Sequence, residues 1–125
     1  MFVLFSSTTY CLIYILAVSL APLPDFQVLE GSEARFEWEY TGEFEEIGFL
    51  DVDLTTAMVV VKPAEVTITA DYISLINSIY KPESLKVGFV IVTATTANTG
   101  NYKIKMTKDT TVLEQTIRLT VVPRK

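Results

Sequence analysis

The sequence predicts an all-β protein, folded as an antiparallel β-sandwich, and three observations lead to this class. Apolar and polar residues alternate with a period of two in several short segments, most regularly in residues 33–40, EARFEWEY. Turn-forming residues separate these segments. No segment has a convincing 3.6-residue period, which an amphipathic helix would need. Many short strands with turns between them are typical of a sandwich or a barrel.

Strict alternation identifies the first group of expected strands. Residues 102–106 (YKIKM) and 116–122 (TIRLTVV) alternate as regularly as residues 33–40. Residues 84–92 (SLKVGFVIV) are apolar at every second position from Leu85. Each of these segments therefore predicts a strand with one face toward a core.

Composition identifies the remaining expected elements. Residues 57–61 (AMVVV) and 66–70 (VTITA) are rich in β-branched side chains, which favour strands. Residues 72–80 (YISLINSIY) come nearest to a helical period and form either a short helical turn or another strand. The turn signals are Gly31-Ser32, Thr41-Gly42, Lys62-Pro63, Lys81-Pro82 and Asn98-Thr99-Gly100.

The first twenty-one residues are typical of a secretory signal peptide. They contain no charged side chain, and their apolar run CLIYILAV is followed by small residues. We expect cleavage near residues 19–21 and a single domain over residues 22–125. An uncleaved signal anchor is the alternative, because the run approaches the ~20 residues of a membrane span. The only cysteine, Cys11, lies in this leader, so we expect no disulfide within the mature chain.

The charge distribution narrows the classes of partner. The net charge of -5 argues against nucleic acid and anionic lipid, which clustered lysine and arginine bind. Between Asp25 and Asp53 the only base is Arg35, whereas bases outnumber acids from Leu54 onward. This uneven distribution of charge can steer association with a complementary surface or with a second copy of the protein. Alternatively, acidic and basic strands pair within the domain and neutralise it.

The residue types present exclude several kinds of catalytic site. The chain has no histidine, so Ser-His and Cys-His nucleophilic pairs and zinc sites of the His/Cys type are absent. Carboxylates remain at Glu43, Glu45, Glu46, Asp51 and Asp53. Their spacing lacks the glycine and further oxygen ligands of a calcium loop, and we interpret them as a solvated acidic loop. We therefore expect no enzyme activity, no metal and no cofactor.

Residues 98–102 (NTGNY) carry a resemblance to a known family. Asn98, Gly100 and Tyr102 match the D-x-G-x-Y corner that precedes strand F in immunoglobulin-like sandwiches, with asparagine in place of the usual aspartate. Upstream, Gly31 precedes Trp38 by seven residues, as a glycine precedes the strand B cysteine of that family. The chain resembles a V-set-like immunoglobulin domain. It is most similar to the cysteine-poor, membrane-distal domains of invertebrate allorecognition and cell-adhesion receptors.

The resemblance implies how the core replaces the family's disulfide. It places Trp38 against Ile104, and Phe49 where strand C usually has a tryptophan. Burial of an indole contributes about 4 to 6 kcal/mol, and a bridge over a loop of this length about 4 kcal/mol, so the exchange is energetically reasonable. The residues expected to form the core are Phe36, Trp38, Phe49, Phe89, Ile91, Tyr102, Ile104 and Leu119.

The resemblance also implies a binding surface, the face of strands G, F, C and C'. In residues 57–61 either Val59 and Val61 or Met58 and Val60 face outward. An alternative interpretation carries equal weight. In it, the charged residues of this face form ordinary cross-strand pairs and the valines of residues 57–61 are buried. The candidate partner-binding residues are Glu46, Leu50, Val59, Val61, Lys103, Lys105 and Arg118.

Together these features predict a secreted or cell-surface recognition module. Its expected partner is another protein, with a second copy of itself among the candidates. No nucleic acid or small-molecule cofactor is expected, and a membrane would be reached only through a segment that this chain does not contain. The alternatives are a soluble secreted immune effector or decoy, and a structural spacer in a longer ectodomain.

Overall fold

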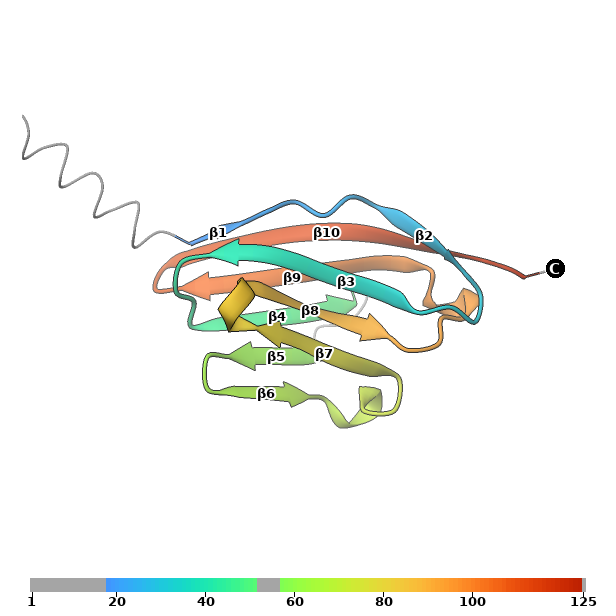
Figure 1. Cartoon of the computed structure of the whole chain (residues 1–125), viewed down its shortest axis with the longest axis horizontal. Coiled ribbons are helices and arrows are strands. Elements are labelled where there is room, and N and C mark those ends of the chain that lie inside the picture. The colour runs from blue at the N-terminus through green and yellow to red at the C-terminus, as the bar shows by residue number, and fades with distance from the viewer. Residues whose placement is uncertain (1–17, 52–56, 125) are drawn as a thin grey trace, which may run out of the picture.

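Two facing β-sheets form the protein in a computed structural model that describes residues 18–51 and 57–124 (Figure 1). In spatial order, the four-stranded sheet contains β1 (Ser19–Leu20), β3 (Ala34–Thr41), β8 (Lys86–Ile91) and β7 (Ile76–Lys81). The six-stranded sheet contains, in order, β2 (Phe26–Leu29), β10 (Thr111–Val122), β9 (Gly100–Lys108), β4 (Glu46–Asp51), β5 (Val59–Lys62) and β6 (Glu65–Ile68). Short 3-10 turns are η1 (Ala70–Tyr72), η2 (Pro82–Ser84) and η3 (Thr96–Asn98).

Side-chain alternation explains which face of each strand is buried. In β3 the residues at every second position from Ala34 are buried, and the charged residues between them are more exposed. β9 and the second half of β10 show the same alternation. Residues 72–80, for which a helical turn and a strand were both open, contain the end of η1 and most of β7. The predicted all-β sandwich is confirmed.

Aromatic rings fill the space between the sheets. Phe36 stacks on Phe89 at 4.4 Å and lies 5.1 Å from the ring of Tyr102. Trp38 stacks on Phe49 at 5.6 Å, and Phe49 is the cross-strand neighbour of Ile104. The eight residues expected in the core are buried, with Trp38 at 1% exposure and Ile104 at 0%. An indole and an aliphatic side chain thus occupy facing sheets of one core cluster.

Side chains of the corner before β9 hold its backbone in place through hydrogen bonds. The Tyr102 hydroxyl donates a 2.5 Å hydrogen bond to the backbone oxygen of Asn98. The Asn98 side-chain oxygen in turn accepts a 2.7 Å bond from the Thr95 backbone N–H. Asparagine therefore supplies the turn and cap that an aspartate would supply, without a charge.

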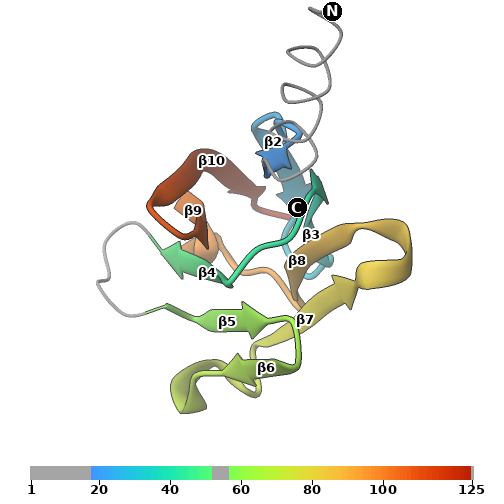
Figure 2. The same cartoon turned by 90° about the vertical axis from the view of Figure 1, so that its left-hand side faces the viewer.

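The N-terminal segment crosses from one sheet to the other. Ser19 and Leu20 pair with β3, the Ala21 N–H donates to Glu39, and Phe26 pairs in parallel with β10 (Figure 2). Residues 19–21 of the predicted leader are thus bonded to β3 at the edge of the first sheet, whereas residues 1–17, with Cys11, lie outside the described residues. Over the described ranges, no helix has the length and apolar character that a membrane span requires.

Four strand connections gather at one end of the sandwich. The β3–β4, β5–β6, β7–β8 and β9–β10 connections lie at the left of Figure 1, and the C-terminus lies at the opposite end. Three of these connections contain residues with positive φ, Gly42 (84°), Leu85 (56°) and Asp109 (52°). This end is called the turn end below.

Candidate interaction surface

The outer face of the six-stranded sheet has its middle at β4. Ile47 and Phe49 are buried, so Glu46, Gly48 and Leu50 point to the other side of the strand. Directly opposite residues of neighbouring strands share a face. Gly48 is paired with Lys105 on β9 and with Val60 on β5, so these residues lie together on the outer face.

An apolar centre lies at Gly48. A Cβ added to this glycine would lie 3.7 Å from the Cβ of Ala57 and 3.8 Å from Cδ1 of Leu50, which are ordinary contact distances. Leu50, Ala57 and Val60 are each half-buried. These four residues, Gly48, Leu50, Ala57 and Val60, are called the apolar centre below. The missing side chain of Gly48 leaves space between its neighbours.

Charged side chains of both signs surround the apolar centre. The Nζ atom of Lys62 lies 4.0 Å from Oε1 of Glu46, and Nζ of Lys103 lies 3.9 Å from Oε1 of Glu114. Exposed pairs of this kind contribute only ~0 to 1 kcal/mol, so they can be exchanged for pairs with another molecule at little cost. Lys105 is exposed beside Glu114 in the β9–β10 register. Arg118, also exposed, is farther along β10 opposite Asn101.

The prediction that Val59 and Val61 contact a partner was wrong. Both are fully buried, because β5 pairs Val59 with Phe49 and Val61 with Ile47, whose side chains point into the core. Val60 points outward in their place. A run of four apolar residues has no alternation of its own, so the sequence could not determine its phase. The register with β4 determines it.

The solved structures identify the fold. The chain superposes on a chimeric titin Z1Z2 functionalized with a KLER exogenous peptide from decorin, with a TM-score of 0.66 at 22% identity over 86% of this chain and 95% of that chain. It matches the titin domains Z1Z2 in complex with telethonin with a TM-score of 0.66 at 22% identity, covering 86% of this chain and 48% of that one. Murine CRIg gives a TM-score of 0.70 at 15% identity, over 87% of this chain and 99% of that chain.

This chain has an immunoglobulin-like fold. At these identities the likeness concerns the fold and not a shared activity. No protein-family model matches the sequence, and no curated protein does.

On the outer face of the four-stranded sheet, charged side chains form ion pairs with one another. The Glu37 carboxylate lies 2.9 Å from Nη2 of Arg35 and 3.5 Å from Nζ of Lys86. Burial by itself raises the pKa of the Glu37 carboxyl, but the hydrogen bond and charge of Arg35 and the charges of Lys86 and Lys81 outweigh it and lower the pKa. Glu37 is thus shared between two cations.

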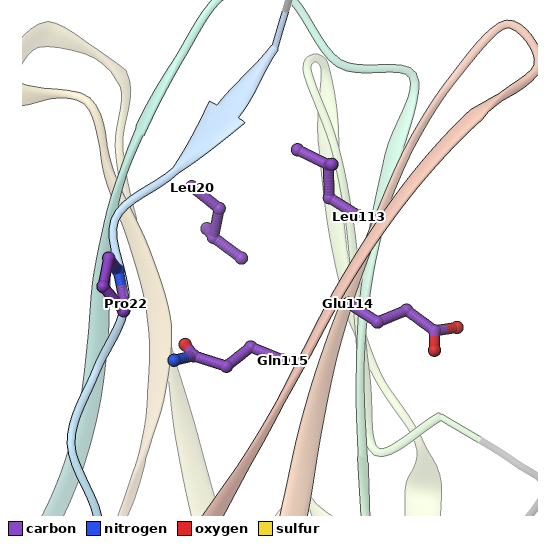
Figure 3. Close-up of a pocket in the computed structure, with 5 residues that line it drawn as sticks. All are labelled: Leu20, Pro22, Leu113, Glu114 and Gln115. Carbon is purple, nitrogen blue, oxygen red and sulfur yellow. The ribbon is translucent and has the colours of Figure 1, made fainter.

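A pocket of about 240 Å³ lies where the N-terminal segment of the immunoglobulin-like domain passes β10 (Figure 3). Leu20 and Leu113 point toward each other across it, and Glu114 points away. The Gln115 side chain is used internally, since its oxygen accepts bonds from the Trp38 indole N–H and the Leu23 backbone N–H. The pocket therefore offers an incoming ligand few free polar groups.

The acidic loop does not assemble a metal site in the described part of the chain. Over residues 18–51 and 57–124, no group of three His, Cys, Asp or Glu side chains is arranged to hold a metal ion. Glu45 instead accepts a hydrogen bond from the Asp109 backbone N–H across the turn end. Asp53, the second member of the predicted Asp51–Asp53 pair, lies outside the described residues.

Proposed function

We propose that this immunoglobulin-like domain is a V-type recognition module that binds another protein through the outer face of its six-stranded sheet. The V-type assignment is supported by β5 and β6, which extend the sheet beyond β4 as strands C' and C'' do in variable-type domains. Secretion or cell-surface display is the location that the leader-like first residues favour.

One observation carries this proposal, the apolar centre with charges around it. Protein interfaces combine an apolar middle, from which charge is largely excluded, with a polar rim. Here Gly48, Leu50, Ala57 and Val60 are the middle. Lysines and glutamates from β4, β5, β9 and β10 form the rim. A neighbour of the same fold, titin Z1Z2, was solved in complex with the protein telethonin.

The partner that we propose is a second copy of the domain. A two-fold contact places each surface against itself, so charged groups can pair across it only where both signs lie within one patch. The rim has this property, since Glu46 lies beside Lys62 and Glu114 beside Lys103. This agrees with the resemblance to allorecognition and cell-adhesion receptors. Its action is binding and not catalysis, because a chain without histidine has few means of acid and base catalysis near neutral pH.

Aggregation of beads that display the domain tests self-recognition, and Gly48→Arg is the variant of choice. The space around Gly48 allows a side chain without displacing the core, and the added arginine would stand in the middle of the proposed contact. Asn77→Arg is the matched control, because Asn77 is exposed on β7 of the other sheet. We expect Gly48→Arg to prevent aggregation and Asn77→Arg to leave it unchanged, with equal melting temperatures.

Charge reversal tests the rim. Lys103→Glu with Lys105→Glu should weaken association while preserving the fold, because both side chains point outward from β9. Aggregation that persists in this variant and in Gly48→Arg would refute the proposed surface. If wild-type beads do not aggregate alone but do aggregate with beads that carry other candidate proteins, the partner is a different protein.

A further inference from the structure

A second pocket, of about 390 Å³, lies at the turn end of the sandwich. It is separate from the outer face of the six-stranded sheet, because residues of three strand connections (β3–β4, β5–β6 and β7–β8) and of the ends of β3, β7 and β9 form its walls. Its volume is within the ~300 to 1,000 Å³ of ligand pockets. The residues that line it are Tyr40, Gly42, Glu43, Phe44, Pro63, Tyr80, Pro82, Leu85 and Lys108.

Three aromatic rings line this pocket, of which Tyr80 is half-buried and Tyr40 and Phe44 are buried, at 4% and 6% exposure. The rings of Tyr40 and Phe44 meet edge to face at 5.3 Å, and those of Phe44 and Tyr80 at 6.0 Å. Burial raises the pKa of the Tyr40 phenol, and the hydrogen-bonded Tyr80 hydroxyl and the Glu83 charge raise it further. The Tyr40 hydroxyl therefore remains protonated near neutral pH, and in a pair of hydrogen-bonded hydroxyl groups one O–H remains free to donate to a ligand.

Leu85, one of the lining residues, has an unusual backbone conformation. Its φ of 56° lies in the left-handed region, where a helix end normally has glycine. Its side chain is 43% exposed, so core packing does not compensate fully for this backbone conformation. The Tyr40 N–H fixes the residue by donating to its backbone oxygen at 3.0 Å. Backbone conformations of this kind are concentrated at functional sites.

The charges on the pocket wall favour a neutral occupant. Glu43 is the anion and Lys108 the cation among the lining residues, so the wall has no net charge that would select a phosphate group or a cationic side chain. The remaining wall consists of aromatic rings, two prolines, Gly42 and Leu85. Such a wall suits an apolar group that also accepts hydrogen bonds.

We infer that this pocket binds a proline-rich, extended segment of a protein partner. An extended proline helix has no internal hydrogen bonds, so its carbonyl groups can accept bonds from phenolic hydroxyls while its rings pack on aromatic side chains. It also loses little conformational entropy on binding. The inference rests on the proposed function of protein recognition, but it concerns a different surface, so each can fail separately.

A synthetic peptide of ten prolines is the probe for this site, and a glycine-serine peptide of equal length is the control. Added to the isotope-labelled domain, the proline peptide should shift the backbone amide resonances of Gly42, Phe44, Leu85 and Lys108 in a saturable way, and those of β10 should stay unchanged. Equal effects of the two peptides, or shifts confined to Gly48, Leu50, Lys103 and Lys105 on the outer face of β4 and β9, would overturn the inference.

Leu85→Gly is the decisive variant because glycine adopts the left-handed backbone without strain, so the fold should persist. Loss of the exposed side chain should weaken proline-peptide binding by about tenfold, as for truncation of an anchoring residue. Tyr80→Phe should weaken it less, through loss of one hydroxyl. Unchanged affinity in Leu85→Gly would refute the site. Bead aggregation without peptide binding would retain the proposed function and reject this pocket.

Discussion

The indole N–H of Trp38 on β3 donates a 2.6 Å hydrogen bond to the side-chain oxygen of Gln115 on β10, and so joins the two sheets. The same oxygen accepts a 3.1 Å bond from the Leu23 N–H, and the Gln115 amide nitrogen donates to the Leu23 carbonyl at 3.3 Å. Three chain segments are therefore connected through one side chain. This arrangement occurs in a core that has no disulfide between its described residues.

Replacing Trp38 with alanine should destabilise the domain strongly. A large buried aromatic residue costs ~3 to 5 kcal/mol when truncated to alanine, which is a large part of the ~5 to 15 kcal/mol that small domains have. Denaturant unfolding followed by circular dichroism measures the loss. Trp38→Phe is the control, since it keeps a ring but loses the N–H, and it should cost less. Unfolding of Trp38→Ala at the wild-type denaturant concentration would contradict this account of the core.

Gln115→Leu should destabilise the domain although leucine is apolar. The change leaves the Trp38 and Leu23 N–H groups without their acceptor, and an unsatisfied buried donor costs ~1 to 3 kcal/mol. Thr116→Ala, the neighbouring exposed residue, is the matched control and should have little effect. The hydrogen-bonding role would be excluded if Gln115→Leu were as stable as that control in the same unfolding experiment.

Two glycines should respond differently to the same substitution. A Cβ at Gly88 would lie 1.8 Å from the backbone oxygen of Phe36, so Gly88→Ala forces β8 away from β3. Overpacking of this kind costs ~1 to 3 kcal/mol or more. At Gly48 the nearest atom would be at 3.7 Å, so Gly48→Ala should change the melting temperature little. Equal melting temperatures of the two variants would show that the strands can separate freely at Gly88.

Stability should fall at alkaline pH because of Tyr102. Burial, with smaller effects of Asp51 and Tyr72, raises the pKa of its phenol from 10.0 to about 12. Unfolded tyrosine ionises first, so this contribution is complete below pH 10 and is lost as the pH rises toward about 12. Urea midpoints measured across this range should decline, and the decline should be shallower in Tyr102→Phe. An identical decline in both proteins would assign the effect to other groups.

Much of the fold could be predicted from alternation alone. The inward faces of β3, β9 and β10 follow from Phe36, Tyr102 and Leu119 and their period-two neighbours, because a strand that is half-buried needs an apolar residue at every second position. The corner at Asn98 and Tyr102 was recognisable because both partners lie within five residues. The absence of histidine likewise excluded whole classes of catalytic site without any coordinates.

The candidate site was predicted less completely. Glu46, Leu50 and the two lysines of β9 lie on the expected face, since each belongs to a strand with a readable alternation. Val59 and Val61 were misplaced because an unbroken apolar run fits either face, and only pairing with β4 selects one. The role of Gly48 at the centre depends on Ala57 and Val60 of another segment, which no local pattern could indicate.

By itself, the amino-acid order determined that this protein forms strands, where most of them turn, and which side chains avoid water, because these properties depend on neighbours close along the chain. Tertiary structure decided which segments meet. Gln115 reaches Trp38 across 77 residues, and the pocket at the turn end takes residues from three separate connections and from the end of β9. Such contacts depend on strand order and register, which arise only when all the strands pack around one core.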